Sequence, residues 1–215
     1  RIIHRGDRFE GRNGETRALF GCSVTVDLQV GFPLTRLRKL PFKNIVRETF
    51  FDLGFSQNVN DLGKAKHFWD FLADEDGELG ASAYNRQWRM WPPSAVGSEV
   101  KNELLVNVGN VDQIRMVYDR LAEDRSSRRA TIITHNPTAV NTSCPPCHLG
   151  MQFMPRGEFL DLMVPARSND MVVGFPLDIA RYAIICQIFA QKCGLRVGKL
   201  YMPSSNSHVY ENCYS

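Results

Sequence analysis

The chain has 215 residues, of which 43% are hydrophobic and 10% aromatic, so it can fold around one sizeable core, and disorder is excluded as its main state. Its 26 basic and 23 acidic residues leave a net charge of +3, too small an imbalance to indicate a nucleic-acid or membrane surface. Six cysteines are too few for a disulfide scaffold, and no apolar run reaches the length of a membrane span. We expect one cytoplasmic domain over residues 1–215 that binds neither nucleic acid nor membrane.

The predicted elements of the first half mix strands and helices. Apolar residues on alternate positions from Phe20 to Val30 predict a strand with one buried face at 20–30. An amphipathic helix is predicted at 45–53 from apolar residues at helical spacing, which are Ile45, Val46, Phe50 and Leu53. Residues 91–109, with two prolines and two glycines, are the expected long loop. Asn110 and Gln113 are spaced as a capping box, which predicts a helix from there to about residue 121.

The second half of the chain predicts a sheet and one long helix. Three short apolar stretches, separated by turn-forming residues, predict successive strands at 130–134, 149–154 and 159–164. A buried helix follows at 177–189, ended by Gly194, and a last strand is expected at 197–202. The predicted fold class is therefore α+β, a large sheet covered by helices, and no linker divides the chain.

The string Cys144-Pro-Pro-Cys147-His148 is the first candidate for chemistry. Covalent haem attachment would need an exported chain and an axial ligand, and a dithiol pair usually begins a helix, whereas a strand-like stretch follows here. Zinc would need a second pair of cysteines or histidines at matching spacing, and the sequence holds none, so no metal is expected. The remaining functional use is a nucleophilic thiolate at Cys147, and the structural alternative is a buried cysteine.

Arginine-rich strings recur in three distant parts of the chain, which are Arg12-Asn13-Gly14, Ser127-Arg128-Arg129 and Arg167-Ser168-Asn169-Asp170. Each string alone is typical of a solvated face. Guanidinium groups and a serine hydroxyl are good partners for phosphate oxygens, so together with a candidate thiolate they indicate a pocket for a small phosphate. A nucleoside monophosphate would fit such a pocket.

The order of further motifs resembles the thymidylate synthase and deoxycytidylate hydroxymethylase superfamily over nearly the whole chain. These motifs are Arg12 with Phe20-Gly21, Gly31-Phe-Pro-Leu34, Glu48, Trp69-Asp70, Tyr84-Asn-Arg-Gln-Trp-Arg89, Ser127-Arg-Arg129, Pro146-Cys-His148, Gln152-Phe153, Arg167-Ser-Asn-Asp170, Gly174-Phe-Pro-Leu-Asp178 and His208-Val-Tyr210. Any one motif is weak, but their joint spacing is specific. The resemblance implies a thymidylate synthase-like fold whose large mixed sheet packs back to back with a second copy in a homodimer.

The resemblance also implies roles for individual residues. Cys147 would bond to C6 of a pyrimidine, so that C5 takes a one-carbon unit from 5,10-methylenetetrahydrofolate. Substrate would be bound by Arg12, Arg167 and Ser168 at the 5′-phosphate, by Arg128 and Arg129 from the second subunit, by Gln152 and Asp178, and by His208 and Tyr210 at the sugar hydroxyl. Glu48, Tyr84, Asp170 and Asp178 would organise water and proton transfer, and the folate would meet Trp69, Asp170, Gly174 and Leu177. The structural alternatives are Trp69 and Tyr84 in the core, a surface His208 and a salt bridge at Glu48.

One departure from the family pattern bears on the substrate. Thymidylate synthases read Gly-x-Pro-Phe-Asn where this chain has Gly174-Phe-Pro-Leu-Asp178, and in the family the Asn amide faces the pyrimidine edge. An ionised carboxylate only accepts hydrogen bonds, which disfavours O4 of uracil but suits the 4-amino group and protonated N3 of cytosine. The cytosine-specific hydroxymethylases carry Asp there, so the resemblance implies a cytidylate 5-hydroxymethylase that adds water after the one-carbon transfer.

Several alternatives stay open at the level of sequence. If the transferred methylene group accepts hydride from the folate in place of water, the reaction is a thymidylate synthase-type methylation of dUMP or dCMP. A non-catalytic homologue would keep the nucleotide pocket without turnover. Ala166 is small where relatives usually have a larger side chain, which leaves room for a 2′-hydroxyl and favours CMP. The excess of arginine over lysine fits a GC-rich bacterium that makes a cytosine-derived antibiotic from CMP, and a bacteriophage dCMP enzyme is the alternative. The family extends beyond the His208-Val-Tyr210 motif, so we expect the segment that closes over folate to be missing from this sequence or disordered.

Overall fold

The computed structural model describes residues 1–11, 13–36, 38–80, 83–91, 110–137 and 145–214. Its described strands form one seven-stranded sheet in the order β1-β2-β7-β5-β4-β3, and β6 also pairs with β7. Both β5 and β6 run parallel to β7, whereas the other pairs are antiparallel, so the sheet is mixed. The strands are β1 (Asp7–Gly11), β2 (Gly14–Asp27), β3 (Thr131–Ile133), β4 (Gly150–Arg156), β5 (Phe159–Met163), β6 (Ala166–Asp170) and β7 (Arg196–Tyr210).

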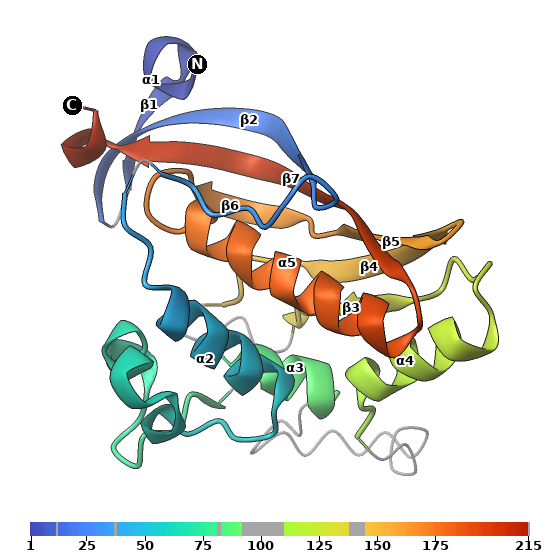
Figure 1. The fold of residues 1–215 in the computed structure, drawn as a ribbon. Helices are drawn as coiled ribbons and strands as arrows, with labels where there is room; N and C mark the ends of the chain where they lie inside the picture. The colour runs from blue at the N-terminus through green and yellow to red at the C-terminus, as the bar shows by residue number, and fades with distance from the viewer. Residues whose placement is uncertain (12, 37, 81–82, 92–109, 138–144, 215) are drawn as a thin grey trace.

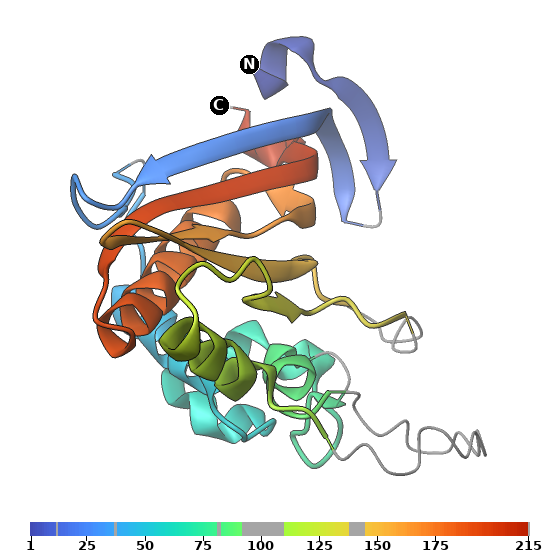
Figure 2. The ribbon, with the colours of Figure 1, turned by 90° about the vertical axis from the view of Figure 1, so that its right-hand side faces the viewer.

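The longest helices lie on one side of this sheet (Figures 1 and 2). The described helices are α1 (Ile2–Arg5), α2 (Phe42–Leu53), α3 (Tyr84–Arg89), α4 (Gln113–Glu123) and α5 (Phe175–Lys192), with 3₁₀ segments at Val59–Phe68, Asp70–Leu72 and Glu211–Cys213. None of the described helices is long and apolar enough to cross a membrane. The strand and helix content agrees with the α+β class predicted from the sequence.

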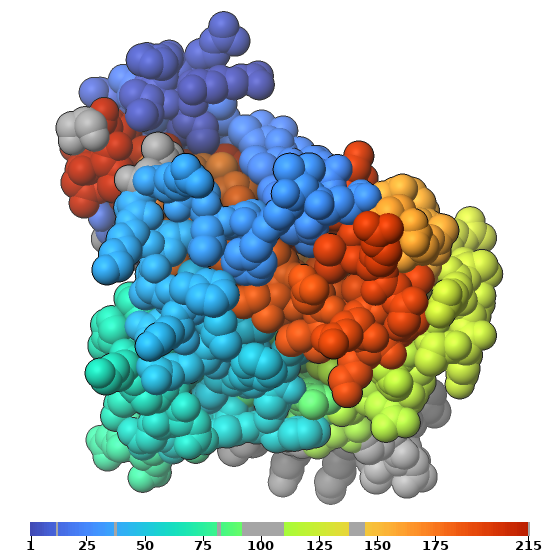
Figure 3. Space-filling model, viewed as in Figure 1, coloured from blue at the N-terminus to red at the C-terminus, as the bar shows by residue number. Residues whose placement is uncertain are grey.

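The core forms between α5 and the sheet. Phe189 of α5 stacks on Phe153 of β4 with ring centroids 4.3 Å apart. Pro176 lies in the first turn, where its missing N–H costs nothing, and Gly194, at φ +64°, follows the last turn as predicted. Figure 3 shows the orange surface of α5 bordered by the blue α2 segment and the yellow-green α4. The helix is therefore packed on several sides, and a polar residue at its buried positions needs a partner.

The opposite face of the sheet carries exposed apolar side chains. In β4, Met151 and Phe153 point into the core, whereas Gln152 and Met154 are exposed. Met163 of β5, which pairs with Gln152 and so lies on the same face, is 43% exposed. Large apolar side chains gathered on one face are typical of a surface that another protein covers.

Three details differ from the sequence predictions. The expected buried face of the first strand is wrong at Phe20 and Val30, which are both 87% exposed. Gly21, at φ +74°, breaks the regular alternation beside Phe20, and the strand ends at Asp27, before Val30. The N-cap of α4 is Asp112, whose side chain accepts from the backbone N–H of Arg115, and not Asn110. The last strand continues to Tyr210, because its polar second half pairs with both β2 and β6. Of the expected loop at 91–109, residues 92–109 lie outside the described residues, and Trp91 forms an isolated bridge with Val111.

The buried face of α2 also differs, and this difference matters for the site. Its buried residues are Ile45, Thr49 and Asp52, whereas Phe50 is 58% exposed. The Thr49 hydroxyl donates to the carbonyl of Ile45 at 2.8 Å, which satisfies it inside the core. Asp52 is satisfied by an arginine on α5, so α2 turns a carboxyl rather than a phenyl ring inward.

Candidate active site

The turn that carries Cys147 is held from two sides. The hydroxyl of Tyr84, on α3, accepts from the backbone N–H of Cys147 at 3.2 Å. From β6, the N–H of Arg167 donates to the carbonyl of Cys147 at 2.9 Å, and its guanidinium donates to the carbonyls of Pro145 at 2.7 Å and Pro146 at 3.1 Å. The half-buried thiol therefore lies on a fixed backbone beside α3 and β6.

His148 is a neutral, buried ring next to the thiol. Burial, followed by the charges of Arg181 and Arg167, lowers its pKa well below the usual value. Arg181 Nη2 lies 3.5 Å from His148 Nδ1 and can only donate, and the Tyr84 hydroxyl lies 3.0 Å from the same nitrogen. Nδ1 is therefore the acceptor, and the ring proton lies on Nε2, 3.5 Å from Asp178 Oδ2.

Three carboxyl groups surround one buried guanidinium. Arg181 Nη1 lies 3.0 Å from Asp52 Oδ2 and 3.3 Å from Glu48 Oε1, both on α2. Its Nη2 lies 3.3 Å from Asp178 Oδ1, one turn earlier on α5. The Asp178 side chain keeps 20% of its surface exposed, whereas Asp52 is 2% exposed, so a ligand can reach Asp178 but not Asp52.

This crowding changes the protonation of the cluster. Burial raises the pKa of Asp178 to about 7 and that of Asp52 to about 7, against the opposing effect of the Arg181 charge. Burial also raises the pKa of Glu48, while Arg181 and Trp69 act in the opposite direction. Asp52 and Asp178 therefore take up and release protons near neutral pH, the range in which general acid–base chemistry works.

The parallel pairing of β6 with β7 brings together most of the predicted phosphate and sugar residues. Ser168 is paired with Asn206, and Asp170 with His208, in the register of the two strands. Oδ1 of Asp170 accepts the backbone N–H groups of Val172 and Val173 at 3.0 and 3.1 Å, which fixes its carboxyl. The ring of His208 meets that of Tyr210 edge to face at 5.2 Å.

Other predicted residues lie apart from this group within one chain. Arg128 and Arg129 are exposed just before β3, at the far edge of the sheet from β6. Gln152 lies near them on the exposed face and donates to the carbonyl of Arg128 at 3.2 Å. Arg12 lies outside the described residues.

The residues expected on the folate side border the carboxyl cluster. Trp69 is half-buried, packs against both core clusters and influences the pKa of Glu48. Gly174 caps the start of α5, and Leu177 directly precedes Asp178 in its first turn. An aromatic ring, a carboxyl and an apolar side chain thus lie around one end of α5.

Two members of the cluster, Asp52 and Arg181, were missed by the sequence reasoning. The available signal was their spacing: Asp52 follows Glu48 by four residues and Arg181 follows Asp178 by three, so each pair shares a helical face. A charged residue in the middle of an otherwise apolar helix, as at Arg181, needs a buried partner.

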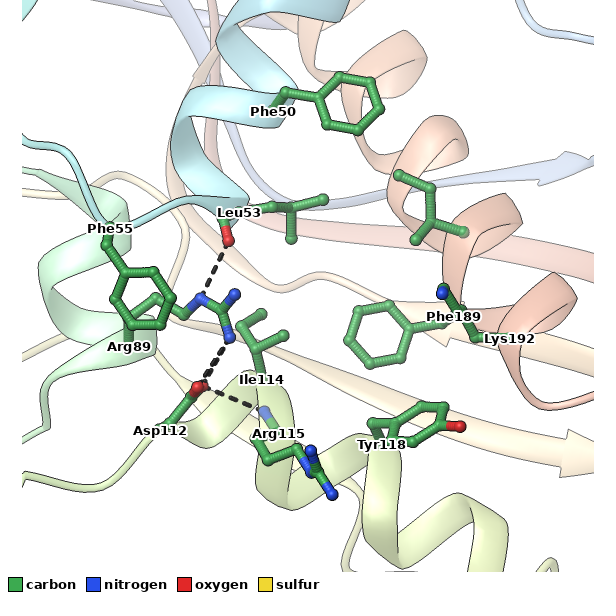
Figure 4. A pocket seen from close by; sticks show the side chains of 11 residues that line it. Phe50, Leu53, Phe55, Arg89, Asp112, Ile114, Arg115, Tyr118, Phe189 and Lys192 are labelled. Atoms are coloured by element: carbon green, nitrogen blue, oxygen red, sulfur yellow. Dashed lines mark hydrogen bonds and ion pairs between the residues drawn. The ribbon is translucent and has the colours of Figure 1, made fainter.

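A separate groove opens between α2, α3, α4 and the far end of α5 (Figure 4). Its volume is about 660 Å³, and it contains the ion pair of Arg89 with Asp112 at 2.8 Å. It holds none of the predicted site residues, and its Phe189 lies about 16 Å along α5 from Asp178. Among the residues that the structure describes, no group of three or more His, Cys, Asp or Glu side chains is arranged to hold a metal.

Comparisons with known proteins place this geometry in a family. The sequence model described as thymidylate synthase matches residues 1–215. The chain is 33% identical over 215 residues to the thymidylate synthase of Buchnera aphidicola subsp. Schizaphis graminum (strain Sg), an alignment that covers 99% of this chain and 76% of that protein. The fold and the comparisons thus define a one-carbon transferase that acts on a pyrimidine nucleotide with methylenetetrahydrofolate as co-substrate. The chain belongs to the thymidylate synthase family.

Proposed function

We propose that this member of the family is a cytidylate 5-hydroxymethylase. Its substrate is CMP or dCMP, and its products are the 5-hydroxymethyl nucleotide and tetrahydrofolate. The observation that carries the proposal is the carboxyl group of Asp178, partly exposed and held by Arg181 Nη2 at 3.3 Å, where thymidylate synthases have an amide.

The carboxyl matches the edge of cytosine. A carboxylate accepts from the 4-amino group and from a protonated N3, and the charge strengthens both hydrogen bonds. Uracil presents an acceptor at O4, which a carboxylate cannot satisfy. Protonation at N3 also withdraws electrons from the ring, so the pairing that selects cytosine assists the attack of Cys147 on C6.

The remaining residues of the site suit the later steps. Cys147 Sγ forms a bond to C6, which makes C5 nucleophilic, and leaves again when the product is complete. Glu48, with its raised pKa, accepts the proton lost from C5 or orients the water that adds to the exocyclic methylene. Arg167 and Ser168 bind the phosphate beside β7, and His208 and Tyr210 bind the sugar hydroxyl.

The folate fits the donor set at the start of α5. Trp69 offers a flat apolar surface for a pterin ring, Asp170 offers a fixed carboxyl for its N–H groups, and Gly174 and Leu177 complete the border. When bound, methylenetetrahydrofolate supplies the one-carbon unit. Tyr84 keeps the Cys147 turn in place while this occurs.

A second copy of the chain would complete the phosphate site. The exposed apolar face of the sheet, with Met154 and Met163, is suited to pack against its own copy. Arg128 and Arg129 are exposed at the edge of this sheet, so a back-to-back homodimer carries them to the partner's site. Ala166, at the start of β6, is small where relatives usually have a larger side chain, which favours CMP.

The test is to incubate the full-length protein with methylenetetrahydrofolate and CMP, dCMP or dUMP, and to follow tritium release from C5 and product mass. The expected result is a cytidylate product heavier by CH₂O. A product heavier by CH₂ would assign methylation instead. Nucleotide binding without tritium release would show a non-catalytic homologue, and equal use of dUMP would refute the cytosine assignment.

A further inference from the structure

Arg181 contacts Glu48 and Asp178, the two carboxyls of the proposed chemistry, and also Asp52, which the substrate cannot reach. It is 4% exposed, and its two terminal nitrogens bridge Glu48 and Asp52 on α2 to Asp178 on α5. Asp52 lies behind it at 3.0 Å and is itself buried. Burying a guanidinium and its counterion costs free energy. We therefore expect the pair to have a function, which is to act on Asp178, the carboxyl that faces the ligand.

The charge balance of the cluster is unusual. Three carboxyls face one guanidinium. Among the described residues, the other charged or titratable neighbours of Asp178 are neutral or acidic, and Arg167 lies farther away, beyond His148. These neighbours are Tyr182 on α5, Tyr84 on α3, His148 before β4 and Asp170 at the end of β6. Within the described part of the chain, Arg181 is therefore the cation in direct contact with Asp178, and its charge favours loss of the Asp178 proton.

We propose that Arg181, with Asp52 as its counterion, is a positioning residue that keeps Asp178 ionised against a bound base and thereby sets the preference for cytosine. The inference rests on the proposed function. A protonated carboxyl has one donor and one acceptor, so it can pair with either pyrimidine. An ionised carboxyl pairs well only with a base that carries the shared proton itself.

Cytosine can carry that proton on N3, whereas uracil would have to carry it on O4, which is far less basic. The guanidinium thus favours the cytosine complex, in which Asp178 is ionised, over the uracil complex, in which Asp178 must be protonated. In the cytosine complex the proton moves from solvent or Asp178 to N3, and no electrons are transferred. The same shift activates C6 towards the thiolate.

The test compares Arg181→Met with Arg181→Lys in the full-length protein. With [¹⁵N3]-dCMP bound, the ¹⁵N chemical shift of wild type and Arg181→Lys should report a protonated N3, and that of Arg181→Met an unprotonated one. The ratio of kcat/KM for dCMP over dUMP should fall about tenfold or more in Arg181→Met, mainly through kcat on dCMP, and recover in part in Arg181→Lys.

Matched variants separate the loss of the Arg181 charge from simple misfolding of the variant. Arg181→Met leaves Asp52 buried without a partner, so Arg181→Met/Asp52→Leu removes both charges and should show the same loss of preference. Lys192→Met controls for a lost cation at the far end of α5 and should keep the ratio. An unchanged N3 signal and ratio in a folded Arg181→Met or double variant would overturn the inference. The proposed function fails separately, if wild type itself does not prefer cytidylate.

Discussion

Replacing Asp178 by Asn should move the enzyme from cytidylate towards uridylate. In the structure Oδ1 faces Arg181 Nη2 and Oδ2 lies near His148 Nε2. The amide oxygen can keep the bond to Arg181, which places an N–H₂ donor where the carboxylate had an acceptor. That donor opposes the 4-amino group of cytosine and matches O4 of uracil.

The expected magnitude follows from one mismatched buried polar contact. Such a contact costs roughly 1–3 kcal/mol, so kcat/KM for dCMP should fall about ten- to a hundred-fold while that for dUMP rises. The fold should survive, because Arg181 keeps Glu48 and Asp52 as partners. The assay is tritium release from both nucleotides, with Asp119→Asn, an exposed carboxyl paired with Arg115, as the control. An unchanged ratio in folded Asp178→Asn would refute the assignment of Asp178 to the base edge.

Three further predictions follow from the site and the sheet. Cys147→Ser should abolish turnover but retain nucleotide binding in calorimetry, and lost binding would assign the thiol a structural role. Mixing inactive Cys147→Ala and Arg129→Ala chains under exchange conditions should restore activity through one intact site per hybrid dimer, whereas no recovery would speak against a shared site. Burial raises the pKa of Asp52 from 3.8 to about 7, so between these values the folded chain binds the extra proton and loses stability as pH rises. Asp52→Asn should flatten that fall in urea unfolding, and an equal slope in both proteins would contradict the cause.

The sequence predicts those parts of the fold that depend on local pattern. The strands in the second half and α5, with its stop at Gly194, follow from apolar runs and turn residues, and the structure contains them. The second half of β7 escaped prediction because its Ser and Asn residues look like a turn, yet they pair with strands far away in the sequence. Pairing of this kind depends on tertiary context rather than on local preference.

The candidate site likewise contains residues that the sequence predicts and residues that only the packed structure shows. Cys147 is predicted from the cysteine motif, Arg167 from an arginine-rich string and Tyr84 from the family resemblance, and the structure brings them together at one turn. Asp52 and Arg181 were not named, because an aspartate on α2 and an arginine on α5 explain each other only once the helices are packed. Apolar periodicity placed Phe50 inside instead, and periodicity cannot recognise a buried charge whose partner is distant in sequence.

The side chain of Arg167 has two roles. Its guanidinium is bound to the carbonyls of Pro145 and Pro146, yet it is also among the groups expected to hold the phosphate. A bound phosphate would contact the same guanidinium nitrogens that hold the Cys147 turn in place. Phosphate binding at one end of the nucleotide would therefore affect the position of the thiol at the other end. We therefore expect cytidine without its phosphate to lose turnover rate as well as affinity, since remote binding energy would no longer be available to align the sulfur with the ring.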